Sequence, residues 1–108
     1  MTHIRRFACN RLYVGKKYLS QAVVEINDKG QVEGYMPLIQ ETPATEWIGG
    51  VIVLWNKEEL PLLKDLKSLL QSLPDGEDAT YAWHITHVDF QQETLTPESI
   101  IRRLLLDV

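Results

Sequence analysis

The sequence is poor in cysteine, in basic residues and in long apolar runs. Cys9 is the only cysteine among 108 residues, so the chain forms no internal disulfide. No apolar run approaches the ~18 residues that span a bilayer, and segment 1–6 has no stretch typical of a signal peptide. The formal net charge is -4 and the basic residues are scattered, which argues against a nucleic-acid surface. We therefore expect a cytoplasmic protein that binds neither a membrane nor nucleic acid.

Motifs of common enzymes are missing as well. No serine lies in a Gly-x-Ser-x-Gly segment, and Gly49-Gly50 lacks the Lys and the Ser or Thr of a phosphate-binding loop. The apolar neighbours of Cys9 favour a small buried side chain, and the alternative is a reactive thiol beside Arg6 and Arg11. We expect no catalytic residue and no cofactor.

The chain does contain enough apolar residues, 44%, for one compact domain. Alternating and branched residues predict strands at 7–14, 19–26, 31–38, 47–55 and 81–90. The segment 27–30 predicts a hairpin turn in which Gly30 is left-handed. In the strand that follows, we expect Val32, Gly34, Met36 and Leu38 to share one face. The run 51–55 is apolar on both faces, which predicts a central strand, and Gly49-Gly50 before it indicates a bulge or a close backbone approach.

Two helices are expected in the second half. Leucines at three-and-four spacing between Leu60 and Leu73 form one stripe, and Thr96-Pro97-Glu98 has the order of a helix start. The predicted fold class is α+β: a mainly antiparallel β-sandwich or bent sheet of about five strands with two helices. The single domain 1–108 would comprise N-terminal strands at 1–55, a leucine-rich helix at 57–73, and a strand and helix at 80–108.

Three residues near one predicted strand are candidate metal ligands. His84 and His87 are three positions apart, a spacing that sends side chains to opposite faces of a strand unless a bulge intervenes. Asp89 is a possible third ligand. Because a catalytic zinc recruits three converging protein ligands, we expect ordinary histidines here and keep His84, His87 and Asp89 as the alternative.

Two parts of the chain resemble a known family. The segments 22–32 (AVVEINDKGQV) and 45–53 (TEWIGGVIV) resemble the opening of amidohydrolase-superfamily enzymes of the cytosine deaminase and chlorohydrolase type. The segments 88–90 and 95–104 (LTPESIIRRL) are similar to the tail of bacterial members, notably from Bacteroidetes. In that family both ends fold into a small β-sandwich, the composite domain, beside a metal-binding (β/α)8 barrel. The resemblance therefore implies a composite-type domain.

The family's catalytic part has no counterpart here. Its enzymes continue from the strand matching 51–54 into a His-x-His metal motif, whereas this chain continues as Asn56-Lys57-Glu58-Glu59. A (β/α)8 barrel needs about 250 residues, and segment 56–80 holds 25. The resemblance thus implies a non-catalytic relative that acts as a protein-interaction or structural module. The alternatives are a small metal-binding hydrolase, a subunit of a split amidohydrolase, and a degenerate product without selected activity.

Aromatic residues bear on the expected partner. The bland interpretation of six aromatics on predicted strands is core packing and cross-strand pairing: Tyr13, Tyr35, Trp47, Trp55, Tyr81 and Trp83. The sharper interpretation is that the face covered by the barrel in the family needs another cover. The leucine-rich helix, a second copy of this chain in a homodimer, or an unknown protein would supply it.

Overall fold

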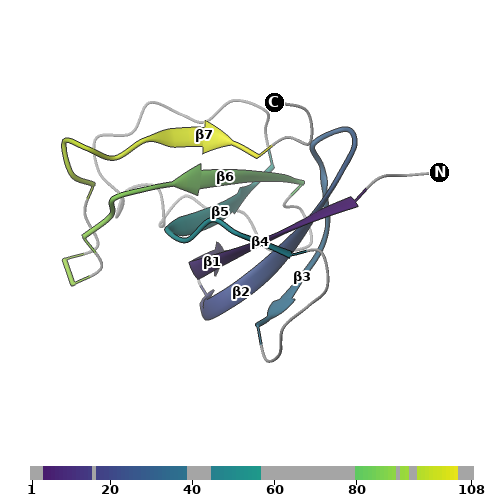
Figure 1. Cartoon of the computed structure of the whole chain (residues 1–108), viewed down its shortest axis with the longest axis horizontal. Helices are drawn as coiled ribbons and strands as arrows, with labels where there is room; N and C mark the ends of the chain where they lie inside the picture. The colour runs from purple at the N-terminus through teal and green to yellow at the C-terminus, as the bar shows by residue number, and fades with distance from the viewer. Residues whose placement is uncertain are drawn as a thin grey trace.

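The computed structural model describes residues 4–15, 17–38, 45–56, 80–89, 91–92 and 95–104. Its regular elements there are seven strands: β1 (Ile4–Val14), β2 (Lys17–Asn27), β3 (Val32–Pro37), β4 (Thr45–Trp47), β5 (Val51–Trp55), β6 (Tyr81–Ile85) and β7 (Ile101–Arg103). They form one mixed sheet in the order β3-β2-β1-β5-β6-β7, with β4 also paired to β1 (Figure 1). The expected α+β class is wrong for the described residues, which contain no helix.

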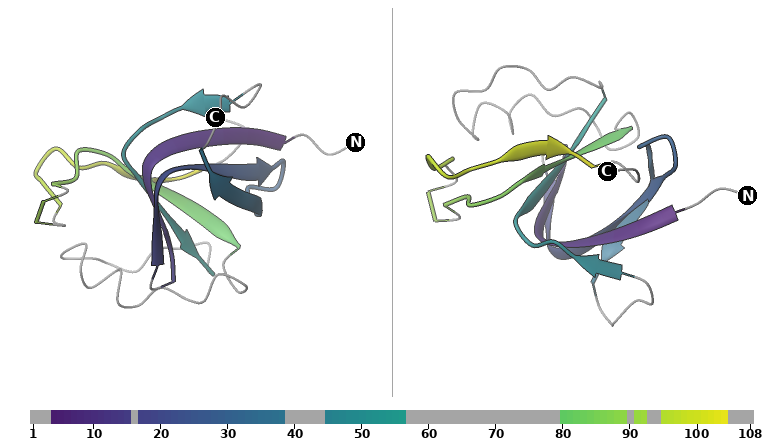
Figure 2. Two further views of the ribbon diagram at one scale, coloured as in Figure 1. Left: turned by 90° about the horizontal axis from the view of Figure 1, so that it is seen from below. Right: turned by 45° about the horizontal axis from the view of Figure 1, so that its top comes forward.

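The β1–β2 hairpin bends sharply at one position. The ladder pairs the residues of β1 with those of β2 throughout, except at Asn10, which lies opposite Gln21. Gln21 has a φ of 55°, a left-handed conformation that is uncommon outside glycine. The alternation of the side chains changes there: Phe7 and Cys9 join the inner core before the bend, and Leu12 joins it after the bend. This bend lets one long hairpin curl around the core (Figure 2).

The turn between β2 and β3 confirms the hairpin prediction. Gly30 has a φ of 75° and donates its N–H to the Asn27 carbonyl oxygen at 3.0 Å. The Asn27 side chain accepts hydrogen bonds from two further amides of the turn. The shared face expected for β3 is wrong, because the ladder shifts register beside Glu25 and Ile26. Val32 therefore packs against the inner core, whereas Gly34 lies opposite Glu25 on the other face.

A double-glycine junction divides the next segment into two strands. Both β4 and β5 run parallel to β1, beside its first and second halves respectively. Gly49 and Gly50 between them have φ values of 67° and 64°. The Gly50 carbonyl oxygen accepts from the amides of Asn10 and Arg11, and the Gly50 amide donates to the Asn10 side chain at 2.8 Å. The expected bulge or close approach is confirmed, because a Cβ on Gly50 would lie 2.6 Å from the Ile85 carbonyl oxygen.

The sheet curls far enough for its ends to meet. Strand β6 pairs antiparallel with β5 on one edge and with β7 on the other. On that second edge, Leu104 donates to the Ala82 carbonyl oxygen at 2.9 Å, and Val32 at the start of β3 donates to the Thr80 carbonyl oxygen at 2.6 Å. Thr80 also donates to the Trp55 carbonyl oxygen of β5, so the start of β3 lies beside the residue that leads into β6. The described strands thus form a partly closed barrel.

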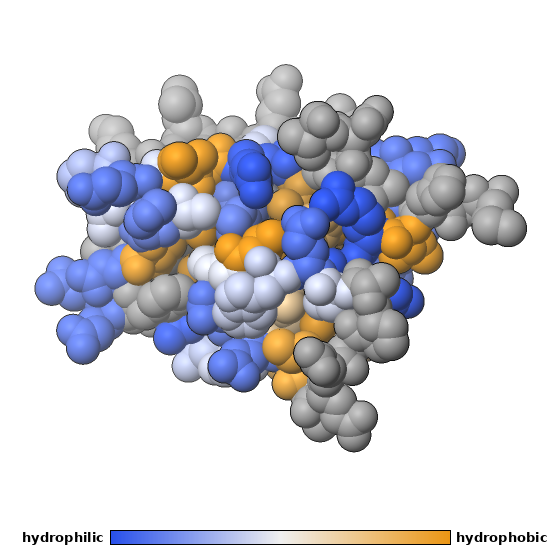
Figure 3. All heavy atoms as spheres, in the orientation of Figure 1, coloured by the Kyte–Doolittle hydropathy of each residue, from blue (hydrophilic) through white to orange (hydrophobic). Residues whose placement is uncertain are grey.

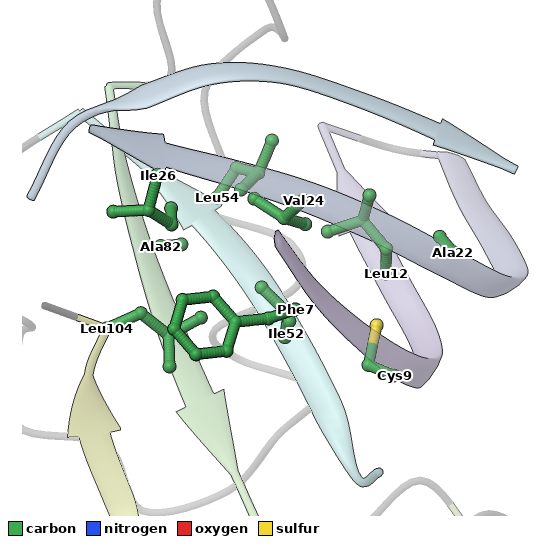
Figure 4. Close-up of a cluster of buried hydrophobic side chains, with 10 residues drawn as sticks. All are labelled: Phe7, Cys9, Leu12, Ala22, Val24, Ile26, Ile52, Leu54, Ala82 and Leu104. Atoms are coloured by element: carbon green, nitrogen blue, oxygen red, sulfur yellow. The ribbon is translucent and has the colours of Figure 1, made fainter. Parts of the chain in front are cut away.

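The core is divided by the central strand β5, whose five residues are all buried. This confirms the prediction of a strand covered on both faces. Ten buried residues form the inner cluster, which fills the inside of the curl (Figure 4): Phe7, Cys9, Leu12, Ala22, Val24, Ile26, Ile52, Leu54, Ala82 and Leu104. Five others form the outer cluster on the opposite face: Tyr13, Val51, Val53, Trp55 and Ile85.

The C-terminal helix expected from Thr96-Pro97 is a turn followed by β7. Ser99 donates its amide to the Thr96 carbonyl oxygen at 3.0 Å, and the Thr96 amide donates to the Ser99 hydroxyl at 2.8 Å. Both hydroxyls then donate to the His87 carbonyl oxygen. The cap residues therefore close a local turn, and the branched Ile101 that follows enters the sheet opposite Ile85.

The leucine-rich helix expected at 57–73 and residues 105–108 lie outside the described residues. Among the residues that the structure does describe, no helix is long and apolar enough to cross a membrane.

Candidate functional site

His84 is a buried residue of the inner side of the sheet. Its ring is 2% exposed, and Nε2 lies 3.1 Å from the Gly49 carbonyl oxygen. Because a carbonyl only accepts, Nε2 carries the proton and Nδ1 is a bare acceptor, which has no hydrogen-bond partner. Burial lowers the pKa of His84 below 6.5, the Gly49 bond opposes that shift, and the charge of Arg102 adds to it. The ring is therefore a neutral support for the double-glycine junction.

The other two candidate ligands point elsewhere. His87 follows the end of β6, is exposed, and has a φ of 55°. Its Nδ1 lies 3.2 Å from the Thr86 hydroxyl. Asp89 accepts the amides of Gln91 and Gln92 with one carboxylate oxygen, which stabilises a turn. Within the described ranges, no three His, Cys, Asp or Glu residues gather as metal ligands. The structure does not bring His84, His87 and Asp89 together.

Cys9 belongs to the inner cluster and has no exposed surface. Burial raises the pKa of its thiol to about 11, and hydrogen bonds with the backbone of Ala22, Arg11 and Ile52 oppose that shift. A thiol of such a pKa is almost wholly protonated at neutral pH, and the protonated form is a poor nucleophile. The structure therefore agrees with the prediction of a small buried side chain.

A group of buried N–H donors lies on the outer face of β5, β6 and β7. We call Trp55, Trp83, Arg103 and Tyr81 the donor cluster. The Nε1 atoms of both tryptophans and the Nε atom of Arg103 are buried and have no hydrogen-bond partner. The register places Trp83 opposite Arg103 and Trp55 opposite Tyr81, and the Arg103 guanidinium stacks on the Tyr81 ring, 4.5 Å from its centroid.

Unpaired buried donors are unusual and costly. A buried N–H without an acceptor costs about 1–3 kcal/mol, and native proteins leave few of them. The sequence placed Trp55 and Trp83 on strands and predicted either core packing or a place on a face that needs a cover. The donors of β5 and β7 lie beside the aromatic residues of β6. This arrangement depends on the β6–β7 register, which the sequence patterns did not reveal.

A second notable surface lies on the outside of β4, β1, β2 and β3. Register places one residue from each strand in a single row, which we call the Trp47 row: Trp47, Ala8, Val23 and Met36. Ala8 and Val23 are buried in the middle, whereas Trp47 is 53% and Met36 is 36% exposed at the ends. In the view of Figure 3, apolar residues occur as separate spots between hydrophilic ones.

One ion pair, Arg6 with Glu25, lies beside the Trp47 row on the same face, and a second, Arg5 with Glu46, lies on the opposite face with Phe7. Arg6 Nε is 2.9 Å from a Glu25 carboxylate oxygen, and Arg5 Nη2 is 2.8 Å from one of Glu46. The Arg6–Glu25 pair beside the row is neutral in sum, although the whole chain has a net charge of -4.

Comparisons with known proteins add no identity: no protein-family model, no curated protein and no solved structure matches this chain.

Proposed function

We propose that this chain is a non-catalytic β-domain that acts by protein interaction, as a barrel-less relative of the amidohydrolase composite domain. The sequence resemblance at 22–32 and 45–53 supports the origin. The observation that supports the interaction role is the exposed indole of Trp47 on β4. Exposed tryptophan is rare on the surface of monomers and enriched at protein interfaces.

The proposed partner is a second copy of the chain. A two-fold homodimer places the same patch of each copy face to face. A patch with excess charge of one sign would therefore repel its copy. The face of the Trp47 row avoids this repulsion, because Arg6 beside the row is balanced by Glu25. Other surfaces of an acidic protein would repel each other more strongly. The dimer would bury Trp47 and Met36 at the ends of the row.

Molar mass in solution tests this proposal. We expect the purified chain to change from monomer to dimer with rising concentration, as measured by sedimentation or light scattering. Trp47→Ser removes the largest exposed apolar side chain of the row, so it should raise the dimer dissociation constant at least about tenfold.

Ile100→Ser is the matched control. Ile100 is 60% exposed, more than Trp47, but it precedes β7 and lies outside the Trp47 row. This variant should dimerise like the unchanged chain. A monomer at all concentrations, or an equal effect of both substitutions, would contradict the proposal.

A further inference from the structure

We propose that the donor cluster binds the carboxylate of a small molecule that has an apolar body. The inference is independent of the dimer, since the cluster lies on β5, β6 and β7 (Figure 1), whereas the Trp47 row crosses β4, β1, β2 and β3.

The three N–H groups of the donor cluster lack matching acceptors. An indole N–H and a guanidinium only donate hydrogen bonds. Trp55 Nε1, Trp83 Nε1 and Arg103 Nε are all buried without an acceptor. Three unmatched donors on neighbouring strands thus favour a ligand that is rich in acceptor atoms.

The donor cluster also contains the positive charge of Arg103. Arg103 forms no ion pair with a described carboxylate, and its hydrogen bond to a described backbone atom, from Nη2 to the Lys29 carbonyl oxygen, is long at 3.5 Å. Stacking on Tyr81 holds the guanidinium in place. A planar guanidinium fixed in this way favours an anion, and its fork matches a carboxylate or a phosphate.

The apolar surroundings of the donor cluster favour a carboxylate on an apolar body over a phosphate. The outer cluster beside the donors includes Val53 and Ile85, neither of which is exposed, and Trp83 and Ile101 pack against it. Ligand sites commonly combine such apolar walls with a few polar groups that orient the ligand. Trp83, Tyr81 and Arg103 are only half-buried, so the ligand would enter from their side.

The indole N–H signals in a proton–nitrogen NMR spectrum test this inference, since the chain has three tryptophans. The probes are phenylacetate, its neutral amide and inorganic phosphate. We expect phenylacetate to shift the signals of Trp55 and Trp83 saturably, while the signal of Trp47 stays in place. The amide and phosphate should bind at least about tenfold more weakly, because the first lacks the charge and the second lacks the apolar body.

Variants identify the groups involved. Arg103→Gln should weaken phenylacetate binding at least about tenfold, since it removes a charge-assisted hydrogen bond. Arg102→Gln is the matched control, because Arg102 is exposed and pairs with His84 on the other side of the sheet. Trp83→Phe keeps a ring but loses the N–H, and should weaken binding with the fold retained, as judged by the Trp47 signal.

Several results would overturn the inference. These are no shift at about 10 mM phenylacetate, a concentration that detects even weak binding, equal shifts at all three tryptophans, and phosphate binding as tight as that of phenylacetate. An equal loss of binding in Arg102→Gln and Arg103→Gln would overturn it too.

Discussion

At the scale of single residues, His84 links the chemistry of one side chain to the stability of the fold. Its Nε2–H supports the Gly49 carbonyl oxygen, and its buried Nδ1 has no partner. A proton on Nδ1 would place a charge in the inner side of the sheet without an acceptor for it. The neutral ring is therefore the form that the folded chain favours.

This preference predicts a pH dependence of stability. The pKa of His84 is lowered in the folded state, so the unfolded chain binds the proton more readily. The contribution of neutral His84 to the free energy of unfolding is complete above pH 6.5. It falls as the pH drops from 6.5 toward the lowered pKa, and it levels off below that pKa. Over that window we expect a loss of at most about 1.4 kcal/mol per pH unit in urea unfolding.

The control is His84→Gln, which keeps an N–H donor but does not titrate. Its free energy of unfolding should change less between pH 6.5 and 5.5 than that of the unchanged chain. Equal slopes for both proteins would show that His84 does not carry the effect.

At the scale of elements, the double-glycine junction determines where β4 ends and β5 begins. Gly50 has a φ of 64° and faces the Ile85 carbonyl oxygen across the sheet. Both properties exclude a side chain at this position, because left-handed backbone strains other residues and the available space is too small.

Gly50→Ala should therefore destabilise the fold by roughly 3 kcal/mol, the combined effect of backbone strain and a steric clash. Thermal or urea unfolding measures the change. Gly34→Ala is the control, since its Cβ would approach only the flexible end of Glu25, at 3.3 Å. That variant should differ from the unchanged chain by less than about 1 kcal/mol. Equal stability of the two alanine variants would contradict this role of Gly50.

Sequence patterns predicted the strands of this protein better than its C-terminal element. The hairpin at 27–30 was predictable because Asn27 and Gly30 act locally. The helix start at Thr96-Pro97 was an equally regular pattern, but the hydroxyls of Thr96 and Ser99 bind the His87 carbonyl oxygen instead. That contact crosses nine or more positions of sequence, so no local rule contains it.

At the scale of the whole molecule, the closure of the sheet was hidden from the sequence for the same reason. The hydrogen bond from Val32 to Thr80 joins β3 to the segment before β6, 48 positions further on. The bend of β1 and β2 at Asn10 and Gln21 accompanies this closure, and a non-glycine residue with a φ of 55°, here Gln21, is not recognisable from its type.

Closure predicts a pattern of amide hydrogen exchange. The Val32 amide should exchange at least about a hundredfold more slowly than that of Tyr35 in the same strand. Leu38 pairs with Gln21, so alternation makes the position of Tyr35 opposite Val24 a non-hydrogen-bonded one, with its amide toward the outer edge. Similar exchange at both amides, followed by NMR, would mean that the ends of the sheet do not stay joined.

The candidate sites likewise differ in how far the sequence could reveal them. From sequence, His84, His87 and Asp89 stood out because metal-ligating residue types are easy to recognise, yet β6 ends between the first two and separates them. The donor cluster was not recognisable, because its three N–H donors are 20 to 48 positions apart and only the sheet register makes Trp83 and Arg103 neighbours.

The double-glycine junction also separates the roles of the strands on either side of it. Three hydrogen bonds between Gly50 and residues 10 and 11 anchor the backbone there. If β4 peels away from β1, the opening stops at this anchor, and β5 keeps its place in the core. A short rim strand can therefore change its sequence or its contacts over evolution, while the interior that determines the fold stays unchanged.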